Sequence, residues 1–165
     1  MPRPPVQKYV HDTIKKYDPG NIILDAGAGP EPNYYAPLFP GKTFHRLDVE
    51  QNETNTIDYI ADLYALPADL YGQYTTVLSL ETLEHLPFPA LAIRNMTNLL
   101  KPGGLFILSS ITSWPIHRHP KDYWRFLPDG FELLLSASPL KILEIKLEKE
   151  HAYLPGGIFA AAQKI

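Results

Sequence analysis

Apolar residues recur at helical spacing in two stretches of the chain and gather in short continuous runs elsewhere. The first stretch predicts an amphipathic helix that ends before Asp18, with apolar positions at Val6, Tyr9, Val10, Thr13, Ile14 and Tyr17. The second predicts a helix over residues 88–100, with one broad face made of Phe88, Leu91, Ile93, Met96, Leu99 and Leu100. It ends where Lys101 is followed by Pro102-Gly103-Gly104, which cannot continue a helix.

Short runs elsewhere predict strands: the run at residues 21–25 is apolar and β-branched, and the run at residues 105–110 is continuous and apolar, as a buried parallel strand is. They cover residues 21–25, 43–48, 58–61, 75–80, 105–110, 140–147 and 158–165. A further helix is expected around residues 129–136. Strands that alternate with helices across short links predict an α/β fold with a doubly wound, Rossmann-like, mostly parallel sheet. No repeat or linker divides residues 1–165, so we expect a single domain.

Composition narrows the function. With a net charge of -3, the 165-residue chain has no basic excess to attract nucleic acid. No apolar stretch approaches the roughly 20 residues of a membrane span, and no signal peptide is visible, so a cytoplasmic protein is expected. The absence of cysteine excludes thiolate catalysis and cysteine-ligated metal. We expect no metal site, and a monomer or a homodimer.

Polar residues gather where the predicted strands end, while the strands themselves are apolar. These residues are Asp25, Asp48, Asp62, Ser79, Glu81, Ser109 and Ser110. Ligands of doubly wound sheets bind outside the carboxyl ends of the strands. The pattern therefore predicts a ligand site at that edge, with Asp25, Ser79 and Glu81 among its residues.

The segment from Asp25 to Glu31, Asp-Ala-Gly-Ala-Gly-Pro-Glu, predicts a tight turn against a cofactor. Gly27 and Gly29 allow positive φ and a close backbone approach. Asp48 can accept both hydroxyl protons of a ribose, or it is a solvated strand-end acid.

Asp62 and Leu63 follow the third predicted strand. The Asp62 carboxylate can accept a hydrogen bond from an adenine amino group, while the amide of Leu63 donates a hydrogen bond to a nitrogen of the adenine ring. Asp62 can also cap the turn over residues 63–66, and both roles are compatible.

The loop chemistry favours a cofactor without phosphate. A dinucleotide fingerprint would place a third glycine at Pro32, and Pro30 and Pro32 each remove an amide donor that a pyrophosphate would need. Asp25 adds repulsion for an anion. These residues favour S-adenosylmethionine, which carries an ammonium and a sulfonium. A nicotinamide-dependent oxidoreductase and a non-catalytic Rossmann-like scaffold are the alternatives.

Five motifs in order resemble the class I S-adenosylmethionine-dependent methyltransferases of the small methyltransferase-11-like type. They are Leu24-Asp25-Ala26-Gly27-Ala28-Gly29, Leu47-Asp48, Ala61-Asp62-Leu63, the run from Val77 to Leu86, and Leu99-Leu100-Lys101-Pro102-Gly103-Gly104. The resemblance implies a seven-stranded sheet with the last strand antiparallel, and cofactor contacts at Gly27, Gly29, Asp48, Asp62 and Leu63. The chain departs from the family where Glu31 replaces a common third glycine.

The sequence offers only candidates for the residues that would act on the methyl acceptor. His85 follows the fourth predicted strand and is a candidate base, although it could instead cap a helix or line the pocket. His119 is a second candidate base, with a solvated loop role as its alternative.

The aromatic segment from Trp114 to Phe126 suits a small polar acceptor, such as a glycosyl group or another hydroxylated metabolite. Tyr123, Trp124 and Arg125 are its candidate substrate contacts; alternatively the aromatic rings anchor the loop and Arg125 pairs with an acid. We expect the segment to be part of a mobile lid.

Overall fold

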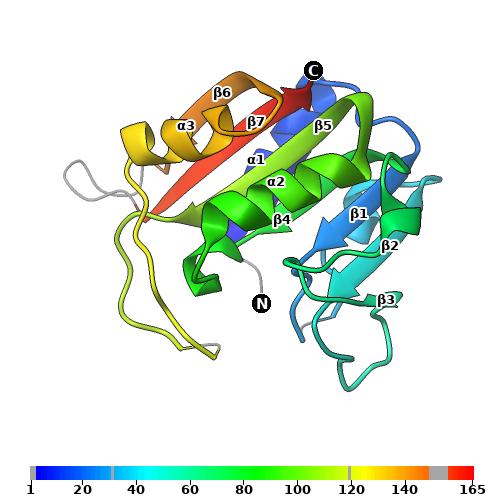
Figure 1. The fold of residues 1–165 in the computed structure, drawn as a ribbon, viewed down its shortest axis with the longest axis horizontal. Helices are drawn as coiled ribbons and strands as arrows, with labels where there is room; N and C mark the ends of the chain where they lie inside the picture. The colour runs from blue at the N-terminus through cyan, green and yellow to red at the C-terminus, as the bar shows by residue number, and fades with distance from the viewer. Residues whose placement is uncertain (1–2, 31, 119, 149–155) are drawn as a thin grey trace.

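The computed structural model describes residues 3–30, 32–118, 120–148 and 156–165. Within these ranges, seven strands form one sheet in the order β3-β2-β1-β4-β5-β7-β6 (Figure 1). Their bounds are β1 (Ile22–Ala26), β2 (Thr43–Asp48), β3 (Tyr59–Ile60), β4 (Tyr74–Leu80), β5 (Leu100–Ile111), β6 (Leu140–Leu147) and β7 (Gly157–Lys164). Strands β1 to β5 pair in parallel, whereas β7 runs antiparallel to both β5 and β6. The predicted fold, including the antiparallel last strand, is confirmed.

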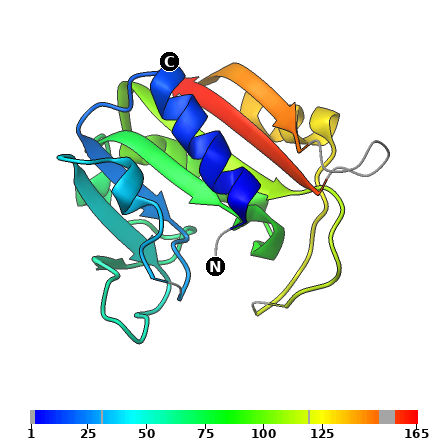
Figure 2. The ribbon, with the colours of Figure 1, turned by 180° about the vertical axis from the view of Figure 1, so that it is seen from behind.

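Helices cover both faces of the sheet. Helix α1 (Pro4–Lys16) lies on one face, and α2 (Pro89–Leu99) and α3 (Pro128–Ser136) lie on the other (Figures 1 and 2). Each of the three begins with proline in its first turn, where φ is already helical and no amide hydrogen bond is lost. Two buried apolar clusters result, one beneath α1 and one beneath α2 and α3.

The apolar face of α2 is narrower than its sequence pattern predicts. Phe88 and Leu91 are 66% and 41% exposed. The buried positions are Pro89, Ala92, Ile93, Met96, Thr97 and Leu99. Phe88 precedes the first turn, and its ring packs against Tyr64 in a neighbouring loop with centroids 6.1 Å apart. That contact takes the ring away from the sheet.

Strand β5 begins earlier than predicted. Leu100 already pairs with Tyr74, and regular pairing resumes at Leu105 opposite Thr76, so the residues between them form an irregularity. A Cβ on Gly104 would lie 2.9 Å from the carbonyl oxygen of Lys101. Gly104 therefore does more than end the preceding helix: it allows the backbone to approach itself closely where β5 begins.

The strand order reverses between β1 and β4, which places a crevice at their carboxyl ends. Among the described residues, three short 3-10 turns connect the elements: η1 (Ala36–Leu38), η2 (Ala68–Leu70) and η3 (Leu83–His85). Of the helices among the described residues, none has the length and apolar character needed to cross a bilayer.

Candidate functional site

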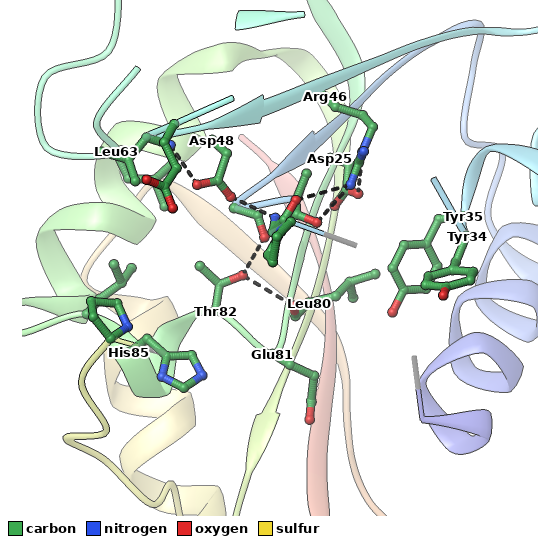
Figure 3. Close-up of a pocket in the computed structure, with 18 of the residues that line it drawn as sticks. Asp25, Tyr34, Tyr35, Arg46, Asp48, Leu63, Leu80, Glu81, Thr82 and His85 are labelled. Atoms are coloured by element: carbon green, nitrogen blue, oxygen red, sulfur yellow. Dashed lines mark hydrogen bonds and ion pairs between the residues drawn. The ribbon is translucent and has the colours of Figure 1, made fainter. Parts of the chain in front are cut away.

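A cavity of about 960 Å³ opens at the carboxyl ends of β1, β2 and β4 (Figure 3). Its wall includes most of the predicted cofactor residues: Asp25, Gly27, Gly29, Asp48, Asp62, Leu63 and Glu81. Figure 3 shows the strand-end carboxylates between His85 on one side and Tyr34 and Tyr35 on the other. The sheet thus brings residues from four separate motifs to one hollow.

The loop after β1 needs both of its glycines. Gly27 has φ +77°, and a Cβ there would lie 2.4 Å from Cγ2 of Thr82. Thr82 packs against this gap, and its hydroxyl donates to the Gly27 carbonyl over 3.2 Å. Gly29 has φ +69° and borders open space, so the backbone itself forms the cavity wall.

A buried arginine holds this loop from below. Arg46 in β2 is 1% exposed and donates through Nη2 to the carbonyl oxygens of Ala28 and Gly29, at 2.9 and 3.4 Å. Its Nη1 also donates to the hydroxyl of Thr56. No role for Arg46 was predicted from the sequence. A charged residue in the middle of a predicted strand could have indicated it, because such a residue needs partners when it is buried.

Asp25 is buried beside that arginine. Its Oδ2 lies 4.0 Å from Nε of Arg46. Burial raises the pKa of Asp25 to about 7, with Arg46 opposing the rise and Asp48 adding to it. With a pKa of about 7, the Asp25 carboxyl carries only part of a negative charge near neutral pH, and Arg46 lies beside it. Asp25 therefore repels an anion less than its sequence position suggests.

Asp48 ends β2 facing the glycine loop. Its Oδ2 accepts a hydrogen bond from the amide of Gly29 at 2.7 Å, and its Oδ1 accepts from the amide of Val49 at 2.7 Å. A carboxylate offers about four acceptor sites, so two remain for a pair of ribose hydroxyls. The two amides also fix the orientation in which those sites face the cavity.

Asp62 caps the turn that follows it. Its Oδ1 accepts from the Tyr64 amide at 2.8 Å, and its carbonyl accepts from Ala65 at 2.9 Å. The capping role is therefore confirmed. Asp62 and Leu63 also line the cavity, as an adenine contact requires.

Glu81 occupies a strained position at the end of β4, with φ +55°. Its Oε1 accepts from the hydroxyl of Ser109 at 2.9 Å, and its Oε2 accepts from Nε of Arg3 at 3.0 Å. Arg3 also donates to Glu148 at 2.6 Å and lies over the Trp114 ring. Arg3 is a second cavity residue that was not predicted. No local sequence pattern marks it, because its partners are 78 and 145 residues away.

Glu84 is fully buried beneath His85. Its Oε2 accepts from the hydroxyl of Ser110 at 2.6 Å, while its Oε1 has no hydrogen-bond partner among the described residues. Burial raises the pKa of Glu84 to about 7, and the nearby charge of Glu81 acts in the same direction. The residue was visible in the sequence beside His85 but was not assigned a role.

His85 points into the cavity from η3 (Figure 3). Its Nδ1 lies 2.6 Å from the carbonyl oxygen of Lys121, which can only accept, so Nδ1 carries the proton. Its Nε2 lies 4.0 Å from Oε1 of Glu84, and its ring meets that of His117 edge to face at 4.9 Å.

The segment after β5 contributes to the cavity through Trp114, His117, Arg118 and Pro120. The predicted substrate residues Tyr123, Trp124 and Arg125 are not on the cavity wall. Arg125 forms a two-pronged ion pair with Asp122, at 2.5 and 2.8 Å, as its structural alternative expects. That hydrogen bonding holds the pKa of Asp122 below its usual range.

One predicted cofactor residue lies off the cavity wall, and two further residues are not described by the structure. Ser79 is fully buried within β4, off the cavity wall. His119 and Glu31 fall outside the described residues. Their roles stay predictions, as do the substrate contacts of Tyr123 and Trp124.

A family model described as a methyltransferase domain matches residues 3–134. A ubiquinone biosynthesis O-methyltransferase of Acinetobacter baylyi is 36% identical over 95 residues, which cover 57% of this chain and 37% of that protein. The chain therefore matches well under half the length of this curated relative.

Solved structures share the fold at low sequence identity. A Burkholderia thailandensis 1,6-didemethyltoxoflavin-N1-methyltransferase, with bound 1,6-didemethyltoxoflavin and S-adenosylhomocysteine, superposes with a TM-score of 0.71 at 18% identity, covering 98% of this chain and 77% of that one. The [4+2]-cyclase SpnF gives 0.71 at 16% identity, covering 94% and 80%. Since one of these proteins is named for a cyclisation, the fold alone does not define the reaction.

Proposed function

The chain belongs to the methyltransferase-domain family, and from that premise we propose that it transfers a methyl group from S-adenosylmethionine to a hydroxyl of a small organic acceptor. The observation that carries the proposal is the cavity at the carboxyl ends of β1, β2 and β4, where Gly27, Gly29, Asp48 and Asp62 converge.

The residues present fit this cofactor. Asp48 would accept the ribose hydroxyls, and Asp62 with the Leu63 amide would hold the adenine. Gly29 lets a ligand approach the backbone, since nothing lies within 4 Å of the place a Cβ would take. Glu81 supplies a carboxylate for the ammonium of the methionine portion.

The protein's contribution to catalysis is mainly alignment and exclusion of water, which can lower a barrier by several kcal/mol. When bound, S-adenosylmethionine supplies an electrophilic methyl carbon; the acceptor oxygen forms the new bond while the sulfur keeps the electron pair of the broken one. His85 and Trp114 also line the cavity, and we assign the side on which they lie to the acceptor.

An oxygen acceptor is supported by the O-methyltransferase relative and by the polar cluster around His85. His85 is the candidate base on geometry, because it lines the cavity and the Lys121 carbonyl holds the proton on Nδ1, which makes Nε2 the basic nitrogen of the ring. His119 remains a second candidate. The sequence-derived idea of a glycosyl acceptor has no specific support from the relatives.

Calorimetry with S-adenosylhomocysteine, NAD and NADP tests the proposal against the alternatives. We expect S-adenosylhomocysteine alone to bind, and tritiated methyl transfer into a small hydroxylated compound from cell extract fractions. Binding of NAD alone would instead indicate an oxidoreductase, binding of none of the three would indicate a scaffold, and label in RNA or DNA would contradict the acceptor class.

A further inference from the structure

We propose that Glu84, His85 and His117 form a binding site for a single divalent transition-metal ion at the acceptor side of the cavity. One candidate ligand atom from each residue lies within 4.8 Å of the other two. Two imidazoles and one carboxylate are the donor set of many catalytic zinc sites, in which a fourth position stays open. No metal site was predicted from the sequence, because the three residues come from η3 and from the segment after β5, which are brought together only when the chain folds.

Glu84 is the anchor of this cluster. The side chain is completely buried, yet Oε1 has no hydrogen-bond partner among the described residues. An unsatisfied carboxylate oxygen in such a place is costly. Oε2 is held by Ser110, so the carboxylate is fixed with Oε1 on the side of His85, 4.0 Å from Nε2.

Both histidines are oriented by groups on their Nδ1 side. The Lys121 carbonyl lies 2.6 Å from Nδ1 of His85. Nδ1 of His117 faces the carboxylate of Asp122 at 3.4 Å and the Pro115 carbonyl at 3.3 Å. Metal-binding histidines characteristically donate their second ring N–H to a carbonyl or a carboxylate, which fixes the tautomer and the ring orientation. The two imidazole rings meet edge to face with centroids 4.9 Å apart, so both histidines lie beside the same space.

The donor set defines the class of ion. Imidazole nitrogens suit zinc and other first-row transition metals, whereas magnesium and calcium prefer oxygen ligands. Zn²⁺ is therefore the probe to use, and Mg²⁺ is the contrasting ion.

The role of the ion, unlike its binding, rests on the proposed methyl transfer. An ion at this place would bind the acceptor hydroxyl at the open position and favour loss of its proton to solvent. The oxygen would then attack the methyl carbon as the carbon–sulfur bond breaks. His85 would serve as a ligand through Nε2 rather than as a base.

Titration calorimetry of the purified chain with Zn²⁺ tests the site directly. We expect one ion per chain, and His117→Ala and Glu84→Gln should each weaken binding at least about tenfold, in line with the loss of a ligand. His11→Ala, a substitution on the exposed surface of α1, is the matched control and should leave the affinity within about twofold. His117 lies on a connecting segment, so its variant is testable even if Glu84→Gln folds poorly.

The same samples separate this inference from the proposed function. Unchanged Zn²⁺ affinity in His117→Ala, absence of Zn²⁺ binding to the folded wild type, or equal affinity for Mg²⁺ would each overturn the site. S-adenosylhomocysteine binding and methyl transfer that continue undiminished after chelation would overturn the ion's catalytic role while leaving the proposed function intact. Zn²⁺ binding without S-adenosylhomocysteine binding would overturn the function and keep the site.

Discussion

Asp48 is the single residue on which cofactor affinity should depend most. We expect Asp48→Ala to weaken S-adenosylhomocysteine by about 1.5–3 kcal/mol, since hydrogen bonds to a charged group contribute about that much. Part of the loss reflects the Gly29 amide, which would lose its acceptor. Calorimetry measures the change, with Asp69→Ala on η2, outside the cavity, as the control. Unchanged affinity in a folded Asp48→Ala protein would remove the residue from the site.

Asp25 should make stability depend on pH. Burial raises its pKa from 3.8 to about 7, with Arg46, Asp48 and Tyr35 as the facing groups. The folded state then binds more protons than the unfolded state between these values, so stability falls as pH rises through that window. In Asp25→Asn the fall in unfolding free energy from pH 5 to pH 8 should be smaller by about 2.5 kcal/mol.

Urea unfolding of both proteins at the two pH values measures this difference. Glu84, whose pKa is also raised, contributes equally to wild type and variant and cancels in the comparison. An identical fall in both proteins would mean that Asp25 stays ionised in the fold, held by Arg46.

At the scale of elements, the segment between β5 and α3 is fastened at identifiable points. The Tyr123 amide donates to the Glu84 carbonyl, Trp124 Nε1 donates to the Leu86 carbonyl, and Arg125 binds both Asp122 and the Trp114 carbonyl. These contacts attach the segment to η3, which carries the cavity residue His85. We therefore expect cofactor binding to make the segment more ordered.

Limited trypsin digestion tests that coupling. Cleavage after Arg118, which lines the cavity, should slow when S-adenosylhomocysteine binds, because a filled cavity restricts the segment. Arg125→Ala should speed cleavage several-fold without ligand, since it releases the pairing with Asp122. Cleavage at Arg94 within α2 serves as the internal control. If the segment resists digestion in every state, it is structural rather than a mobile lid.

Elements were predictable where one local pattern dominates. The expected bounds of β2 and β6 agree with the structure, because a turn residue marks the start of each run, Gly41 before β2 and Pro139 before β6. The start of β5 was missed because its pairing with Tyr74 across Pro102-Gly103-Gly104 is a tertiary contact. The same limit applies to the site: Gly27, Asp48 and Asp62 mark strand ends, whereas the burial of Arg46 and the contact of Arg3 with Glu81 depend on strand order.

For the whole molecule, one sheet joins all the elements, with α1 and the C-terminal strands sharing the core beneath it. Tyr9 of α1 stacks on Phe159 of β7 at 4.9 Å, and Arg3 connects α1 to Glu148 and to the cavity. Because contacts between the two ends of the sequence complete both the core and the site, we expect residues 1–165 to unfold as one cooperative unit.

Scanning calorimetry with and without ligand checks this expectation. A single transition should appear, with calorimetric and van't Hoff enthalpies equal. S-adenosylhomocysteine at 100 times its Kd should stabilise the chain by about 2.7 kcal/mol. For a chain of this size, that stabilisation corresponds to a rise of about 8 °C in Tm. The single unfolding transition should move as a whole. Asp48→Ala should show a much smaller rise at the same ligand concentration. Two transitions, of which the ligand moves only one, would mean that the cavity belongs to a part of the fold that is stable independently of α1 and β7.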